Sequence, residues 1–516
     1  MTLEEIRDIV RVIKKYEIAA QKPLSFNMPS SDESRISRFY QILLDDIVSS
    51  DQEAIKNIYG EQPSLGKYKT LKSYFAVRAI NNIAFLDFTG TSLSQHTRAI
   101  YKCYKYLFAI SVLLALGSRS GAIRLSRKIL KLATKYEFHT IIIDLLDRLK
   151  THSFQIGNTK DYDKYQSMLD ERINILAIEL KIKSLEQRTT IVFAKSLFVE
   201  DKIRMDAQIA LKEIRFLMQK ADTFLGRLSY YRLLYLSDQI EGYPIKSVEA
   251  CDQAIAFMLE NKHMSPPSRF AEFALYKLEN YVLARDYENG RAAVKYCEEH
   301  INTGMNLWFT VKEYEFLLMM QTVNFDNAVK IYNDVIRHDR YNTQLEHLRE
   351  KWDIFGLYVD YLVHSGLLNS STEQKEIPFR KSNLLRTKRV KQRLVYSPTY
   401  SKDKRGFNVA LLVMNVLILL ESNKKDLLIE QTEALSTYRF SYLNQNHCKQ
   451  SFILFKLIRL MIRNEFDLTK ISKKCVDIEK SLRSAPLVSG ELLESIQILP
   501  PSWVWSRMKT ILANKQ

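Results

Sequence analysis

The sequence predicts an all-α protein, namely an α-solenoid of antiparallel helix hairpins followed by a C-terminal helical bundle. Two observations lead to this fold class. First, the 516 residues include only 14 Gly and 11 Pro, too few for the many tight turns of an all-β chain. Second, a small turn residue followed by an aromatic residue recurs, and we term it the turn–aromatic motif. Its copies are Asp161-Tyr162, Gly242-Tyr243, Asp286-Tyr287 and Asn324-Phe325. The last three copies stand 44 and 38 residues apart, a spacing typical of stacked helical arrays.

The N-terminal region is predicted to contain four helices. Apolar residues at three- and four-residue steps predict the first of them, and a loop containing Pro and Ser follows it. That loop, of about 14 residues, is too long for the tight turn of a DNA-binding helix-turn-helix. We therefore interpret the region as further solenoid or a capping domain. Its predicted helices cover 3–20, 35–58, 67–87 and 92–116, and Gly117 ends the last one.

The middle of the chain, 117–366, is predicted to alternate helices and short turns. Helices of roughly 14–24 residues are expected, and short connections make consecutive helices antiparallel neighbours. The turn–aromatic motifs mark the second helix of each hairpin, and we expect their aromatic rings to pack between hairpins. A small residue three positions after the ring, Gly290 or Ala328, lies where a neighbouring helix must approach closely.

These features resemble tetratricopeptide repeats, in which an aspartate–aromatic turn leads into a second helix with an early small residue. The segments Asp286-Tyr287-Glu-Asn-Gly290 and Asn324-Phe325-Asp-Asn-Ala328 carry the resemblance. The spacings exceed the 34-residue unit of that family, and Tyr165 and Lys246 replace the small residue in the other two copies. The resemblance implies a fold and a mode of macromolecular binding, without naming a ligand.

The helical periodicity of the sequence ends near Gly366, which indicates that a second part of the chain begins there. Pro378 and Pro398 interrupt a stretch without helical periodicity, and helices are predicted again from Phe407, over about 426–443, 447–463 and 467–483, and from Pro500-Pro501. The segments around 401–408 and 433–443 resemble the C-terminal half of bacterial helical-repeat proteins of unassigned function. The predicted division is therefore 1–116 (N-terminal helices), 117–366 (repeats), 367–406 (basic connection) and 407–516 (C-terminal bundle).

The best-defined surface feature predicted is a basic stripe along one helix near 121–136. The formal charge of +17 favours anionic partners if it clusters, and no acid occurs between Gly117 and Tyr136. Such a stripe could follow a phosphate backbone or an acidic helix. The alternative is a solvated outer face partly neutralised by acids on neighbouring helices. The residues of the stripe are Arg124, Arg127, Lys128, Lys131 and Lys135.

A second basic cluster lies in the connection 367–406. Its density of cations favours an anionic partner, and Tyr396 and Tyr400 add rings that could stack on bases. A basic loop without a partner is the alternative, because no RRM, KH or zinc-finger signature accompanies it. The candidate contact residues here are Arg386, Lys388, Arg389, Lys391 and Arg393.

Cysteine usage and hydropathy predict a cytoplasmic protein. The five cysteines are far apart and lack any C-x-x-C spacing, which argues against a disulfide framework or a zinc site. The most apolar stretch, Val409 to Leu420, is too short to cross a bilayer. We expect no transmembrane segment.

No familiar catalytic signature occurs: the chain lacks the phosphate-binding, dinucleotide-binding and nucleophile-elbow motifs and the H-E-x-x-H zinc motif. We therefore expect no enzyme activity, cofactor, metal or small-molecule substrate. The predicted function is a non-catalytic scaffold or adaptor with a protein partner. The alternative is a nucleic-acid-binding helical array that uses the basic stretches, and an enzyme without familiar motifs is a third hypothesis.

Overall fold

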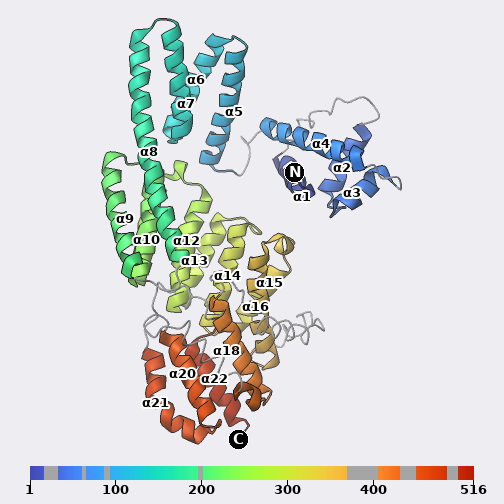
Figure 1. Cartoon of the computed structure of the whole chain (residues 1–516), viewed down its shortest axis with the longest axis vertical. Coiled ribbons are helices and arrows are strands. Elements are labelled where there is room, and N and C mark those ends of the chain that lie inside the picture. The colour runs from blue at the N-terminus through green and yellow to red at the C-terminus, as the bar shows by residue number, and fades with distance from the viewer. Residues whose placement is uncertain are drawn as a thin grey trace. The chain divides into compact units, whose positions relative to one another are not determined.

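The structure is a computed structural model, and every regular element that it describes is helical, which confirms the all-α prediction (Figure 1). The chain divides into two compact units, Met1–Asp170 and Glu171–Gln516. This division into two units does not test the four ranges predicted from the sequence, which stay predictions. No helix within the described ranges has the length and apolarity needed for a bilayer crossing. The described residues are 1–16, 33–60, 65–86, 93–195, 201–368, 405–429, 449–484 and 498–515.

The first four helices of unit 1 share a small core. In it Phe39 makes edge-to-face contacts with Tyr68 and Phe75, at ring distances of 5.9 and 5.0 Å. The predicted single helix over 35–58 is wrong, because the chain turns after the second helix and the side chain of Ser50 accepts a hydrogen bond from the Glu53 amide. That cap starts a new helix. The helices are α1 Leu3–Tyr16, α2 Glu33–Leu44, α3 Asp51–Tyr59 and α4 Leu65–Phe85.

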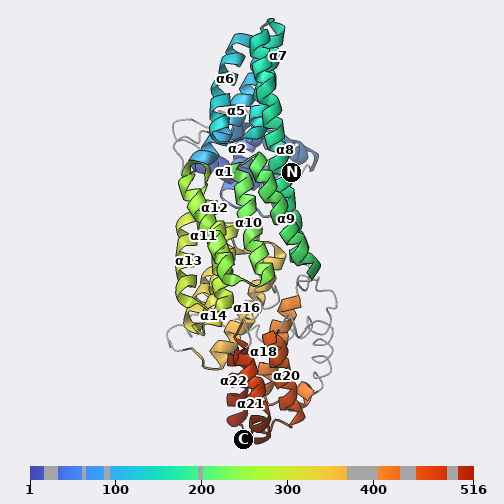
Figure 2. The ribbon, with the colours of Figure 1, turned by 90° about the vertical axis from the view of Figure 1, so that its left-hand side faces the viewer.

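Unit 1 continues with three helices in antiparallel succession. They are α5 Gln95–Ala115, α6 Arg119–Lys135 and α7 His139–Gln155, and each packs on the next. Gly117, with φ 81°, makes the left-handed turn between α5 and α6 that a glycine adopts without strain. Figures 1 and 2 show α5, α6 and α7 side by side.

Helix α8, Thr159–Lys195, is longer than predicted. It runs for 37 residues from unit 1 into unit 2, whereas we expected helices of roughly 14–24 residues. The physical reason is that no Gly or Pro occurs between Thr159 and Lys195, so no residue interrupts its backbone hydrogen bonds. The motif Asp161-Tyr162 lies in its first turn.

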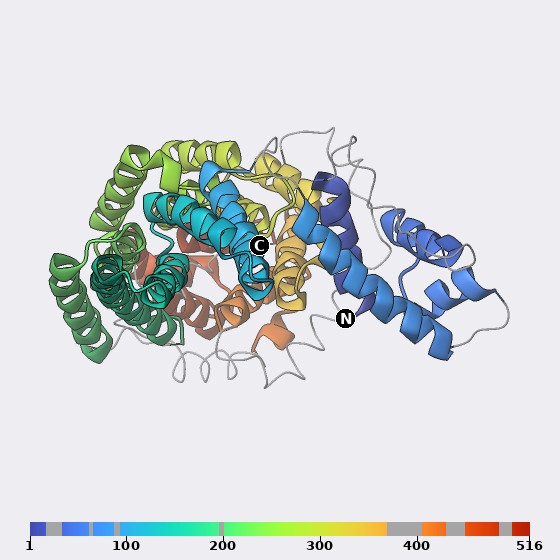
Figure 3. The same ribbon diagram turned by 90° about the horizontal axis from the view of Figure 1, so that it is seen from above.

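Unit 2 contains the hairpins that the motifs predicted. The motifs at Tyr243, Tyr287 and Phe325 stand at the starts of three helices, and the Asp286 side chain accepts a hydrogen bond of 3.1 Å from the Asn289 amide. Figures 2 and 3 show the helices following one another from green to yellow. The helices are α9 Asp201–Lys220, α10 Phe224–Glu241, α11 Pro244–Glu260, α12 Pro267–Ala284, α13 Tyr287–His300, α14 Asn306–Gln321, α15 Phe325–Ile336 and α16 Glu346–His364, with short 3₁₀ turns at Lys262–Met264 and Tyr341–Thr343.

The small residue after the motif ring allows close packing, as predicted, in two copies. A Cβ atom added at Gly290 would lie 2.5 Å from Leu318 Cδ2, and Ala328 is fully buried. The prediction that all four rings pack between hairpins is wrong for Tyr243, which is 48% exposed. Lys246 takes the place of the small residue there, and its ammonium lies 4.5 Å from the centre of the Tyr243 ring.

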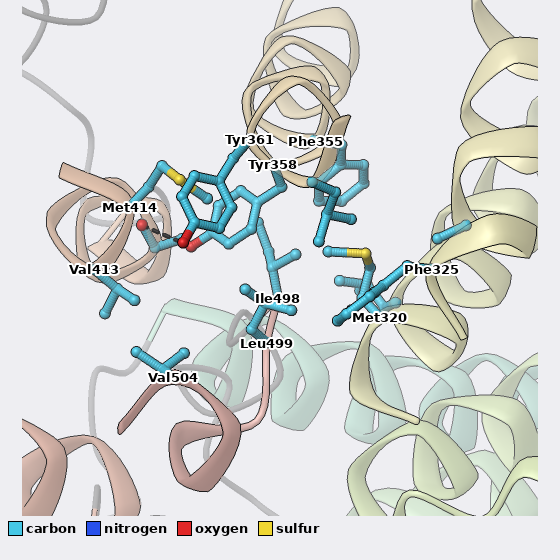
Figure 4. Packing of buried hydrophobic residues seen from close by; sticks show 14 of the residues in the cluster. Met320, Phe325, Phe355, Tyr358, Tyr361, Val413, Met414, Ile498, Leu499 and Val504 are labelled. Carbon is cyan, nitrogen blue, oxygen red and sulfur yellow. Dashed lines mark hydrogen bonds between the residues drawn. The ribbon is translucent and has the colours of Figure 1, made fainter. Parts of the chain in front are cut away.

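The C-terminal helices share one hydrophobic core with α12–α16 (Figure 4). This core includes Phe355 and Tyr358 of α16, Met414 of α18 and Val504 of α22. The Tyr358 hydroxyl donates a hydrogen bond of 2.7 Å to the Ala410 carbonyl. Most of the predicted helix over 426–443 lies outside the described residues. The described helices are α18 Arg405–Glu421, α20 Lys449–Arg463, α21 Leu468–Ser484 and α22 Pro501–Ala513.

Two glycine substitutions test the close approach of α13 and α14. Gly290→Ala places a methyl group against Leu318, so we expect the free energy of unfolding to fall by about 1–3 kcal/mol. Gly66→Ala, in α4, meets no atom within 4 Å and is expected to raise it by about 0.5 kcal/mol. Urea unfolding followed by circular dichroism measures both. A Gly290→Ala protein as stable as the wild type contradicts the close contact.

Candidate functional site

The hairpin of α5 and α6 presents the strongest candidate surface. The Ser94 side chain starts α5 by accepting a hydrogen bond of 3.1 Å from the Thr97 amide. Cys103 and Ile110 on α5 are fully buried, and Ile129 and Ala133 are buried on α6. Burial of these apolar residues turns the opposite faces of both helices toward solvent.

The outward face of α6 carries the predicted basic stripe. All five predicted cations are exposed, and they recur at steps of three and four residues, so they lie on one face of the helix. The structure therefore brings Arg124, Arg127, Lys128, Lys131 and Lys135 together.

The acids on the neighbouring helix α7 do not neutralise this stripe. Asp144 binds Arg148 at 2.5 Å, and Asp147 binds Lys150 at 3.0 Å, so both carboxylates pair within α7. Among the residues that the structure describes, the side chains of Arg124, Arg127, Lys128 and Lys131 make no ion pair or hydrogen bond. Lys135 lies 5.7 Å from the centre of the Tyr136 ring. The carboxylates of α7 thus do not pair with these four side chains, and a solvated outer face remains the alternative to a binding surface.

Helix α5 adds cations and exposed aromatic rings to the hairpin, which the sequence prediction did not include. No Asp or Glu occurs between Asp87 and Glu137, so the hairpin is entirely cationic in its charged residues. Exposed aromatic residues also lie along α5, and their spacing of three and four residues was a signal in the sequence. The cations of the hairpin are Arg98, Lys102, Lys105, Arg119, Arg124, Arg127, Lys128, Lys131 and Lys135.

The second predicted basic cluster lies outside the described residues. This applies to the candidate contacts Arg386, Lys388, Arg389, Lys391 and Arg393.

Unit 2 contains a polar network that the sequence did not reveal. We call α10, α12 and α14 first helices, because each precedes a helix that begins at a turn–aromatic motif. We also include α16, which has no such partner helix. Arg232 on α10 donates two hydrogen bonds, of 2.6 and 2.8 Å, to the Glu272 carboxylate on α12. The Tyr276 hydroxyl donates a third to Glu272 at 3.1 Å. Lys351 on α16 pairs with Glu313 on α14 at 2.8 Å.

Glu279 on α12 lies at the centre of this network. The Tyr235 hydroxyl of α10 donates a hydrogen bond of 2.9 Å to its carboxylate, and Tyr314 of α14 forms another. Burial raises the pKa of Glu279 above the usual carboxyl value, and burial also raises the pKa of both tyrosines. Groups with shifted pKa values are candidates for catalysis, but ion-pair networks produce the same shifts. Here the groups bind one another and cross-link three helices.

The cysteines of the described residues are poor nucleophiles. Burial raises the pKa of Cys103 to about 11 and that of Cys297 to about 12, so both thiols stay protonated at neutral pH. In the described part of the chain, no three His, Cys, Asp or Glu side chains are grouped to hold a metal ion.

No protein-family model, curated protein or solved structure matches the chain. The resemblance to tetratricopeptide repeats therefore enters the functional argument as a proposal.

The raised pKa of Glu279 predicts a pH-dependent stability. The folded protein holds this proton more tightly than the unfolded chain, so the stabilising contribution is present below the unfolded-state pKa and is lost as the pH rises through the folded-state pKa. Glu279→Gln keeps a neutral acceptor for both hydroxyl groups. We expect this variant to match the wild type near about pH 4 and to be more stable at about pH 7, by about 1.4 kcal/mol per unit of pKa difference.

Urea unfolding of both proteins at several pH values measures the difference. Equal stability of the two proteins across this range contradicts the pKa shift, as does a variant that loses stability when the pH rises.

Proposed function

We propose that the protein is a non-catalytic, tetratricopeptide-like binding protein of the cytoplasm and that its α6 stripe binds a nucleic acid. The supporting observation is a row of exposed cations that lack carboxylate partners among the described residues. Neighbouring cations repel one another unless an anion lies among them. A phosphate backbone supplies regularly spaced anionic groups and releases its counterions when it binds such a row.

A binding role is also supported by the polar network of unit 2. The titratable groups with shifted pKa values, such as Glu279 and Tyr235, form hydrogen bonds with each other. They cross-link helices, as structural ion-pair networks do. Because these titratable groups serve as links between helices, the network favours a binding protein over an enzyme.

Charge reversal along α6 tests the proposal. Arg124→Glu, Arg127→Glu and Lys131→Glu, combined in the full-length protein, should weaken binding of labelled oligonucleotides. Each lost phosphate contact reduces the magnitude of the slope of log affinity against log salt by about 0.7–0.9. The slope of the triple variant should therefore be smaller in magnitude than that of the wild type by about 2–3. Fluorescence anisotropy across a salt series measures both quantities.

A matched control reverses three exposed lysines elsewhere: Lys202→Glu on α9, Lys295→Glu on α13 and Lys473→Glu on α21. The change in net charge is the same, so the control should keep most of its affinity. Absence of salt-sensitive binding by the wild type at low ionic strength would refute the nucleic-acid proposal.

A protein-binding scaffold or adaptor is the second candidate, and α9 supports it. Met205, Ile209 and Phe216 lie on one face of α9, and each is more than half exposed. Apolar residues grouped on an exposed face mark protein-binding surfaces.

Affinity purification of the tagged protein from its own cells, with and without nuclease, tests the scaffold. Partners that persist after nuclease treatment and are lost with Ile209→Glu and Phe216→Glu support it. Partners that all disappear with nuclease argue for nucleic acid instead.

A further inference from the structure

The outward face of α5 is aromatic, although it points away from the core. Tyr101, Tyr104 and Phe108 follow one another at steps of three and four residues, so they lie on one face. Their exposed fractions are 45%, 54% and 71%. The opposite face holds the fully buried Cys103 and Ile110. One exposed ring needs no explanation, but three in succession on a solvent-facing side of a helix indicate a binding surface for a ligand or a partner.

A cation lies among these rings. Lys105 is exposed and follows Tyr101 by four residues and precedes Phe108 by three, which places it on the same face. Helix α6, with its stripe, packs directly against α5 (Figure 2), and packed helix axes lie about 8–10 Å apart. Three aromatic rings and a cation therefore share the outward face of α5, and the helix packed beside it carries the basic stripe.

The spacing of the rings suits consecutive bases. At 1.5 Å per residue, Tyr104 lies about 4.5 Å beyond Tyr101 along the helix, and Phe108 about 6 Å beyond Tyr104. Stacked nucleotides rise about 3.4 Å per base along one strand, and an extended strand spaces its bases more widely. Each ring could thus receive the face of one base.

We propose that the outward face of α5 binds single-stranded nucleic acid, with bases stacked on Tyr101, Tyr104 and Phe108 and phosphates held by Lys105 and neighbouring cations of the α5–α6 hairpin. This inference rests on the proposed function and narrows it to one class of nucleic acid. A single strand exposes base faces for stacking, whereas a duplex covers them with neighbouring pairs.

A lipid surface fits these observations less well. A membrane-bound helix buries an apolar face below the headgroups and keeps its cations on the polar side. Lys105 lies between the rings, so insertion of this face would bury its charge at a high cost. An acidic protein would satisfy the cations but gives no reason for rings at the spacing of bases.

Aromatic substitutions in the full-length protein test the stacking. Tyr104→Ala and Phe108→Ala should each weaken binding of a labelled oligothymidine by roughly 5- to 150-fold, the range for loss of one stacked base. Phe108→Tyr should bind like the wild type, whereas Phe108→Leu, apolar but without a ring, should behave like Phe108→Ala. Because these side chains are exposed, circular dichroism should show unchanged helix content. Phe154→Ala on α7, an aromatic as exposed as Phe108, is the matched control and should leave affinity unchanged.

A fluorescent reporter gives a direct readout of contact. The four native tryptophans, Trp308, Trp352, Trp503 and Trp505, all lie in unit 2. Phe108→Trp therefore introduces the single tryptophan of unit 1. Stacking of a base on it should quench its fluorescence on addition of oligothymidine, with a midpoint that matches the binding curve.

The outcomes separate this inference from the proposed function. Equal affinity for single strand and duplex, lost on reversal of the α6 charges but unaffected by the α5 substitutions, overturns the inference and leaves the proposed function standing. No salt-sensitive binding to either form overturns both. Binding to phosphatidylserine vesicles or polyglutamate, but not to oligonucleotides, that depends on Phe108 also overturns the inference and assigns the face to lipid or to an acidic protein.

Discussion

The hydrogen bonds of Glu279 hold the first helices of unit 2 in register. This carboxyl on α12 accepts from Tyr235 on α10 and forms another hydrogen bond with Tyr314 on α14. A buried carboxyl without partners is costly, so one alignment of the three helices is favoured over shifted ones. The pair Arg232–Glu272 adds a second link between α10 and α12, and the pair Lys351–Glu313 links α14 to α16. Apolar packing alone would tolerate several registers, because it has no direction.

Several carboxylates of unit 2 and both carboxylates of α7 are paired with cations, whereas α5 and α6 have cations without any carboxylate on the same two helices. In unit 2 the carboxylates of the first helices bind cations on neighbouring helices, and Asp144 and Asp147 of α7 bind cations on their own helix. Helices α5 and α6 contain no carboxylate at all. The cations of the α6 stripe are exposed to solvent, where their summed potential attracts anionic ligands over distances near a Debye length.

Local signals accounted for most helix starts and some of the packing. Asp286 caps α13 as its sequence indicated, and Gly290 makes the close approach expected of it. The same reasoning failed where a side chain two or three positions away changed the outcome. Tyr243 is exposed beside Lys246, which stands where two other copies have a small residue. The cap at Ser50 divided a segment that periodicity alone joined into one helix.

The sequence by itself determined the helical class, the positions of the hairpins and the basic face of α6, because periodicity, caps and glycine turns act within a few residues. Only the tertiary structure decided which charges are neutralised and which rings are exposed. Arg232 and Glu272 are 40 residues apart, and the exposure of Phe108 depends on which face of α5 meets α6. Both depend on contacts between helices distant in sequence, where burial and electrostatic pairing are set by packing partners that no local pattern specifies.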